Sequence, residues 1–227
     1  MRVSWRSPRA PIWHDGRWRS GTGWSPSCHT AGVRLFVAVR PPGPVLDRVA
    51  ALRRPAQAGV RWTTRAQWHV TLRFLGEVAE ADLAEVVDAM ATVAARHRPL
   101  TAVLGPVTGR FKERILHVPV TGLDDLAADV IAATATMGDA PPEDRAFQGH
   151  LTLARVRPRQ ARLSPPALPP SVVGRPLAGS WTVRELTLVA SDRRPGGSAY
   201  SLIDRAPLGS GDAPGDVPGD ASGDGSG

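Results

Sequence analysis

Residues 68–73 read WHVTLR and residues 149–155 read GHLTLAR, so a His-x-Thr-Leu pattern occurs once in each half of the chain. In each copy the histidine and the threonine are two residues apart, and alternate residues of a β-strand project from the same face. The residues between them, Val70 and Leu151, are apolar and would point into a core. The repeat therefore predicts two half-buried strands that each present a His–Thr pair.

A single histidine on a strand is more often a structural residue than a catalytic one. This chain has six histidines, and two of them occupy matching positions in matching tetrapeptides. Such a duplication favours a site in which both motifs act together. We therefore take His69 and His150 as candidate catalytic residues, with Thr71 and Thr152 as candidate substrate ligands.

These residue types suit the cleavage of a phosphodiester without a metal. Histidine has an unperturbed pKa of about 6.5, so one imidazole can take a proton from water while another protonates the departing alkoxide. Threonine hydroxyls can donate to non-bridging phosphate oxygens as charge accumulates there. A metal site is the competing interpretation, but the motifs contain no His-x-His pair, no carboxylate and no cysteine. We expect neither a metal nor a cofactor.

The sequence around the motifs alternates between strand and helix patterns. Strands are predicted at residues 34–40, 68–75, 100–107, 114–120, 148–156, 182–191 and 199–204. Helices are predicted from Pro44, over 83–94, and after Thr121, which forms a possible capping box with Asp124. The proline-rich stretch 159–180 reads as a surface loop. This order fits an α+β fold with helices packed on antiparallel sheet.

Composition and charge exclude some classes of protein and favour a phosphate-binding one. The 227 residues are 42% hydrophobic, and no run approaches the roughly 18 apolar residues of a membrane span. The net charge is +7, and Lys112 is the only lysine, so arginine supplies nearly all the positive charge. Arginine's planar guanidinium suits phosphate, although a bias toward arginine codons would give the same excess. The single cysteine, Cys28, excludes an internal disulfide and suits the cytoplasm.

The paired motifs resemble those of the 2H phosphoesterase superfamily. The extended motifs HVTLRFLG at 69–76 and HLTLAR at 150–155, and the PGG-x-x-Y ending at Tyr200, are similar to its RNA 2′,3′-cyclic phosphodiesterase and 2′-5′ RNA ligase branch. The similarity runs over about residues 33–208. It implies a bilobed fold, with two antiparallel sheets around a central cleft and helices packed on the outside. It also implies hydrolysis of RNA 2′,3′-cyclic phosphate ends to 2′-phosphates.

The resemblance also implies roles for individual residues. His69 would be the proton donor to the leaving 3′ oxygen, and His150 the acceptor that activates water, while Thr71, Thr152 and Arg155 would hold phosphate. Strict alternation puts Arg155 on the face opposite His150, so its role requires a bulge. Three further residues are expected to line the cleft: Phe36, Arg73 and Tyr200. One departure from the family pattern is His117, which stands where a tryptophan or another aromatic is usual.

The resemblance also bears on the two ends of the chain. Residues 1–32 hold four tryptophans and five arginines without periodicity, so we expect an irregular extension. Because the similarity begins near Val33, we hypothesise that translation starts there; a basic arm that grips RNA is the alternative. Residues 33–206 are the expected catalytic domain, and 207–227 an acidic, disordered tail.

RNA ends or small cyclic nucleotides are therefore the expected substrates of a monomeric cytoplasmic enzyme. Two other functions remain open. The same site could run in reverse as a 2′-5′ RNA ligase, with a 5′-hydroxyl replacing water. A non-catalytic module that binds RNA ends would use the same basic cleft, since phosphate contacts dominate such binding.

Overall fold

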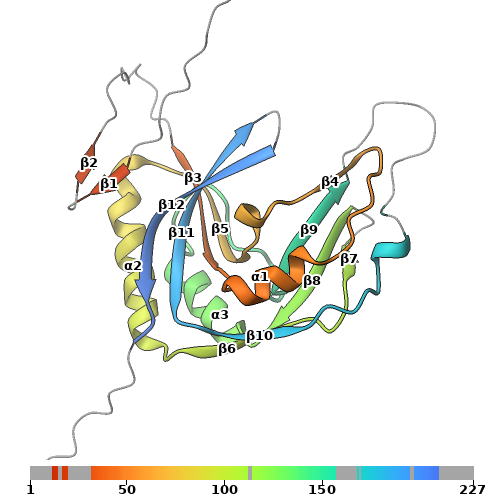
Figure 1. The fold of residues 1–227 in the computed structure, drawn as a ribbon. Helices are drawn as coiled ribbons and strands as arrows, with labels where there is room; N and C mark the ends of the chain where they lie inside the picture. Colours follow the sequence, from red (N-terminus) through yellow and green to blue (C-terminus); the bar gives the residue numbers. More distant parts are fainter. Residues whose placement is uncertain are drawn as a thin grey trace, which may run out of the picture.

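The computed structural model describes residues 12–14, 17–19, 32–111, 114–156, 168, 170–194 and 197–209. Within these residues a ten-stranded sheet has the order β10-β6-β8-β9-β5-β3-β11-β12, with β4 on β9 and β7 on β8 (Figure 1). The strands are β3 Val33–Val39, β4 Val60–Trp62, β5 Val70–Val78, β6 Leu100–Leu104, β7 Gly109–Phe111, β8 Ile115–Thr121, β9 His150–Val156, β10 Gly179–Val183, β11 Glu185–Arg194 and β12 Gly197–Pro207. The helices are α1 Gly43–Ala50, α2 Leu83–Arg96 and α3 Asp124–Ala133.

The expected α+β class is confirmed, and the two antiparallel halves prove to be joined into one sheet. The joint lies between β5 and β9, which pair through Val70 and Leu151. From it, β3, β11 and β12 continue on one side and β8, β6 and β10 on the other. Figure 1 shows the two halves spreading apart from this joint. The two motif strands are therefore neighbours although they come from opposite halves of the sequence.

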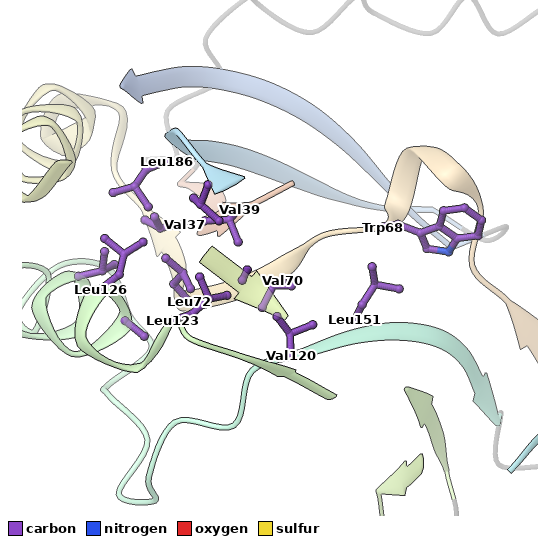
Figure 2. Packing of buried hydrophobic residues seen from close by; sticks show 14 of the residues in the cluster. Val37, Val39, Trp68, Val70, Leu72, Val120, Leu123, Leu126, Leu151 and Leu186 are labelled. Carbon is purple, nitrogen blue, oxygen red and sulfur yellow. The ribbon is translucent and has the colours of Figure 1, made fainter. Parts of the chain in front are cut away.

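Apolar residues from both halves pack into one core beneath the joint. The intervening motif residues Val70 and Leu151 are fully buried, as are Val37 of β3 and Leu126 of α3 (Figure 2). Burying a side chain of this size stabilises the fold by about 1.5–3 kcal/mol. The core thus fixes the inward face of each motif strand, and the histidines and threonines occupy the other face.

The helices start where the sequence predicts, but one of them is capped differently. Pro44 lies in the first turn of α1, as expected. The capping-box prediction for α3 is wrong, because Thr121 is the last residue of β8 and no side chain caps the helix. Gly122, with a φ of +83°, instead turns the chain between strand and helix. At the other end of α3, the Thr134 hydroxyl donates to the Val130 carbonyl oxygen at 2.6 Å.

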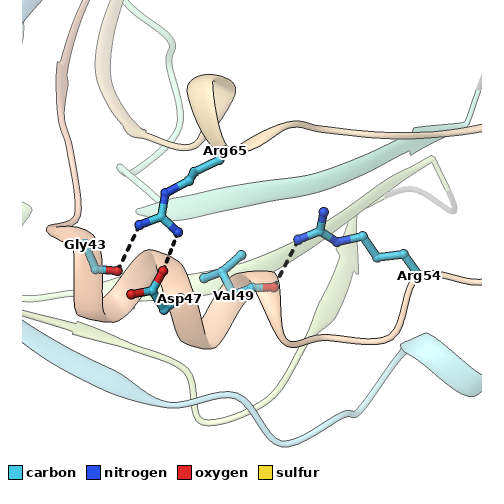
Figure 3. Close-up of polar contacts among 5 residues, drawn as sticks. All are labelled: Gly43, Asp47, Val49, Arg54 and Arg65. Atoms are coloured by element: carbon cyan, nitrogen blue, oxygen red, sulfur yellow. Dashed lines mark hydrogen bonds and ion pairs between the residues drawn. The ribbon is translucent and has the colours of Figure 1, made fainter.

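The segment before His69 is tied to α1 by two arginines (Figure 3). Arg65 donates to the Asp47 carboxylate at 2.6 Å and to the Gly43 carbonyl oxygen at 3.2 Å, and Arg54 donates to the Val49 carbonyl oxygen at 3.2 Å. The Arg65–Asp47 pair is exposed, so its contribution to stability is small. These contacts position the connection that leads into the first motif.

Several predicted boundaries differ from the structure. The strand expected at 182–191 is two strands, β10 and β11, which are separated by Arg184. The described part of the 159–180 stretch is not only surface loop, because Leu168, Val172 and Leu177 are buried and β10 begins at Gly179. The short strands β4 and β7 were not predicted. Runs of three residues are too short for their periodicity to be recognised.

Both chain ends are described only in part. Within the extension, β1 Ile12–His14 and β2 Arg17–Arg19 pair antiparallel, which differs from the wholly irregular structure expected there. At the other end, the disordered tail was expected from residue 207, but Pro207 is the last residue of β12 and Leu208 is buried. The other residues of 1–31 and those from 210 lie outside the described residues. None of the helices in the described part is long and apolar enough to cross a bilayer.

Candidate active site

The two His-x-Thr pairs come together at the joint of the sheet. In the antiparallel register set by Val70 and Leu151, His69 lies across from Thr152 and Thr71 across from His150. We call His69, Thr71, His150 and Thr152 the His–Thr quartet. It lines an open pocket of about 600 Å³, part of which is continuous with solvent. The other lining residues are Arg61, Thr63, Gln67, Arg155, Ser198 and Tyr200.

Each motif strand contains an irregularity directly after its threonine. The register of β5 against β3 shifts between Val37 and Ala38, and that of β9 against β8 shifts between Leu116 and His117. In both motif strands the leucine of His-x-Thr-Leu is the extra residue. A β-bulge of this kind turns the following side chains to the opposite face from the one that strict alternation would give. The two strands therefore depart from alternation at equivalent positions.

In β9 the bulge brings Arg155 to the pocket. Leu153 and Ala154 are both buried, and Arg155, the next residue, is exposed and lines the same pocket as His150. This is the bulge that a phosphate-binding role for Arg155 requires.

In β5 the bulge has the opposite consequence for Arg73. Its side chain is 5% exposed, and the guanidinium donates to the carbonyl oxygens of Phe74 at 2.6 Å, Ala140 at 2.5 Å and Pro141 at 3.0 Å. Arg73 is not among the residues that line the pocket. The expectation that it lines the cleft is therefore wrong, and the residue instead ties β5 to the segment that leads to His150.

Aromatic side chains surround His69. Phe36 stacks on the imidazole, with ring centroids 4.6 Å apart, and Tyr200 meets both rings edge-on at 5.2 Å. Phe36 is 3% exposed and is not among the residues that line the pocket, so it supports His69 from behind and the expectation that it lines the cleft is wrong. Tyr200 is half-buried and lines the pocket, as expected.

A backbone carbonyl orients each catalytic candidate. Nδ1 of His150 lies 2.8 Å from the carbonyl oxygen of Gln148, and the backbone of Gln67 makes the corresponding bond to His69. A carbonyl only accepts, so Nδ1 of a neutral His150 carries the proton and Nε2 keeps its lone pair. The partner is two residues before the histidine in both motifs. This shared Gln-x-His signal was not recognised from the sequence.

Both imidazoles are harder to protonate than a free histidine. Burial lowers the pKa of His69 to about 4, and the charges of Arg40, Arg155 and His150 act in the same direction, while the bond to Gln67 opposes them. Burial also lowers the pKa of His150, and the positive charge of Arg155 adds to this effect. A bound phosphate anion would oppose these effects, because an anion favours the imidazolium.

A third histidine lies behind His150. The buried ring of His117 stacks on Phe111, with centroids 3.7 Å apart and planes within 5°, and its centroid is 5.7 Å from that of His150. Gly109 makes room for it, because a Cβ there would lie 3.1 Å from the imidazole. Burial, and then the charge of His150, lower the pKa of His117. The position that departs from the family pattern thus packs against the second motif.

Two of the unpredicted lining residues hold the pocket in shape. The hydroxyl of Thr63 lies 2.8 Å from the carbonyl oxygens of Thr152 and Leu153, where β9 bulges, and accepts from the Trp68 indole at 3.0 Å. The Gln67 amide donates to the Ser198 carbonyl oxygen at 2.7 Å. The bonds to β9 and to Ser198 join segments far apart in sequence, so no local pattern could have identified them.

Sequence comparison places the chain among phosphoesterases. The family model described as LigT like Phosphoesterase matches residues 39–107, which include the first motif. An RNA 2′,3′-cyclic phosphodiesterase of Geobacillus stearothermophilus is 34% identical over 113 residues, which are 47% of this chain and 36% of that protein. Another from Aeropyrum pernix is 33% identical over 121 residues, 50% of this chain and 68% of that protein. The chain thus spans about a third of the first relative's length and two thirds of the second's.

Solved structures agree over a longer part of the chain. The Thermus thermophilus protein TT0787 has a TM-score of 0.63 at 27% identity, covering 77% of this chain and 97% of that one. Escherichia coli LigT complexed with 3′-AMP has a TM-score of 0.57 at 28% identity, covering 78% and 98%. With the paired motifs at the joint of the sheet, these similarities show that the chain belongs to the LigT-like family of 2H phosphoesterases.

Proposed function

We propose that this protein hydrolyses terminal 2′,3′-cyclic phosphates of RNA to 2′-phosphates without a metal. The observation that carries the proposal is the His–Thr quartet, which presents two imidazoles and two hydroxyls to one pocket with Arg61 and Arg155. The relatives named RNA 2′,3′-cyclic phosphodiesterase support the same reaction.

In the proposed mechanism the histidines act on opposite sides of the phosphorus. Nε2 of His150 takes a proton from water as the water oxygen bonds to phosphorus. The bond from phosphorus to the 3′ oxygen breaks, and that oxygen takes a proton from His69, so the 2′-phosphate remains. Thr71 and Thr152 donate to non-bridging oxygens, where negative charge accumulates in the transition state.

The lowered pKa values predict an acidic optimum for kcat/KM. This parameter reports the free enzyme, in which one histidine must be protonated and the other neutral. Since the pKa of His69 is about 4 and that of His150 is also lowered, the maximum should lie below about pH 6.5, with a loss approaching tenfold per pH unit on the alkaline side. Bound phosphate should move the optimum of kcat to higher pH. The pH dependence of kcat/KM and of kcat tests this prediction, and a kcat/KM maximum above about pH 7.5 contradicts it.

The direct test is turnover of a short RNA that ends in a 2′,3′-cyclic phosphate, with EDTA present throughout. We expect a 2′-phosphate product, identified by its mass and by its separation from the 3′-phosphate isomer. An RNA bearing a 5′-hydroxyl is added in a parallel reaction. A product joined through a 2′-5′ linkage would favour the ligase direction, and binding without turnover would favour the binding module.

A further inference from the structure

Two arginines oppose each other across neighbouring strands at the pocket. Arg61 of β4 pairs directly with Arg155 of β9, and both line the pocket. Like charges directly opposite on antiparallel strands destabilise the pairing. Within the described part of the chain, neither guanidinium has a carboxylate or a hydrogen-bond acceptor as its partner, and no acidic side chain lines the pocket. The pair therefore leaves two positive charges uncompensated at one place.

The arginine pair lies beside the His–Thr quartet and not within it. Arg155 follows Thr152 by three residues along β9, on the side away from His150. A strand rises about 3.3 Å per residue, so its backbone is on the order of 7–10 Å beyond that of Thr152. The β4 strand extends along the same outer part of β9, pairing from Val60 with Val156 to Trp62 with Ala154. A group held between the two arginines would be next to a phosphate held by the quartet.

We propose that Arg61 and Arg155 together bind a second phosphate, the phosphodiester on the 5′ side of the terminal nucleotide. Guanidinium groups bind phosphate through paired, charge-assisted hydrogen bonds, and an anion between them relieves their repulsion. The inference rests on the proposed function and narrows its substrate class. The enzyme selects RNA chain ends over cyclic mononucleotides, which lack this phosphate.

Arg61 is the residue on which to test the proposal. Arg155 also acts on both catalytic candidates, since its charge lowers the pKa of His69 and of His150. Arg61 is not among the groups that shift the pKa of either histidine. Arg61→Gln removes its charge while retaining a long polar side chain. The matched control is Arg98→Gln, because Arg98 is exposed and does not line the pocket.

Three substrates with the same terminal adenosine distinguish the second phosphate from the first. They are adenosine 2′,3′-cyclic phosphate, the same compound with a 5′-phosphate, and a trinucleotide with that cyclic end. For Arg61→Gln we expect kcat/KM to fall about 10- to 100-fold on the last two, mainly through KM, and by less than about twofold on the first. Arg98→Gln should leave all three unchanged. The salt dependence of trinucleotide binding should also weaken, by about 0.7 in the logarithmic slope.

Equal losses on all three substrates would overturn the proposal, because Arg61 would then act on the scissile phosphate or only add to the positive electrostatic potential of the whole pocket. No loss on any of them would overturn it as well. A measurement of product binding distinguishes this inference from the proposed function, because binding can be measured without turnover. Wild-type protein should bind a trinucleotide 2′-phosphate at least about tenfold more tightly than adenosine 2′-phosphate, and Arg61→Gln should remove most of that difference. If nothing is hydrolysed, the proposed function fails while this comparison still decides the second-phosphate site.

Discussion

Replacing His69 or His150 with alanine is expected to lower kcat for a 2′,3′-cyclic phosphate by about 10²–10⁴, with substrate binding largely retained. Each histidine is proposed to move one proton in the transition state, and the described residues that line the pocket include no other histidine and no carboxylate. Thr71→Val should lose less, since it removes one donor among several. The measurement is single-turnover hydrolysis beside equilibrium binding of the product nucleotide.

His97→Gln is the matched control for these variants. His97 contacts Asp129 at 2.8 Å between α2 and α3 and does not line the pocket. Its replacement should therefore leave kcat unchanged. The double variant His69→Ala with His150→Ala should lose about as much as one single variant, because residues that act as a unit are not additive. Turnover that persists in the double variant would refute the two-histidine mechanism.

Arg73→Met is expected to lower the free energy of unfolding by about 3–5 kcal/mol. The substitution keeps the length of the side chain but leaves three backbone carbonyls without their charged donor, on Phe74, Ala140 and Pro141. Urea unfolding measures the change. Arg205→Met is the control: its ion pair with Glu185 is exposed, so it should cost less than about 1 kcal/mol.

The same variant tests the place of Arg73 in the fold. Because the side chain does not reach the pocket, kcat per folded molecule should stay within about threefold of wild type under conditions where the variant is folded. An unfolding free energy within about 1 kcal/mol of that of wild type would contradict a stabilising role for the Arg73 hydrogen bonds. A large loss of kcat in fully folded protein would indicate that Arg73 contributes to the catalytic cleft after all.

Sequence periodicity predicted the motif strands correctly only as far as each threonine. Up to that point alternation gives the right face, since Val70 and Leu151 are buried and the quartet lines the pocket. Beyond it the bulges reverse the pattern, and nothing in the composition of TLRF marks a bulge. Arg73 was therefore assigned to the wrong face. For Arg155 the need for a bulge was recognised only because the family resemblance gave the residue a role.

The pairing of Arg61 with Arg155 was beyond sequence reasoning for a different reason. It depends on the register of β4 against β9, which brings together residues from opposite halves of the chain. The same holds for the backbone bonds of Thr63 to β9. Local patterns predict which face of a strand is apolar, but register between distant strands is set by the packed core.

The matched bulges also make the two ends of the pocket chemically different. Five residues beyond its motif histidine, one strand presents Phe74, which packs against the cluster that contains Phe36, and the other presents Arg155. Because β5 and β9 are antiparallel, Arg155 lies beyond Thr152 and Phe74 lies beyond Thr71, at opposite ends of the quartet. A site built from two similar halves thus has a cationic end and an apolar end. A chain end that is itself asymmetric, with a base on one side and a phosphate backbone on the other, then has one favourable direction of entry. In the proposed mechanism, the two motif histidines take different tasks because such a substrate lies only one way between them.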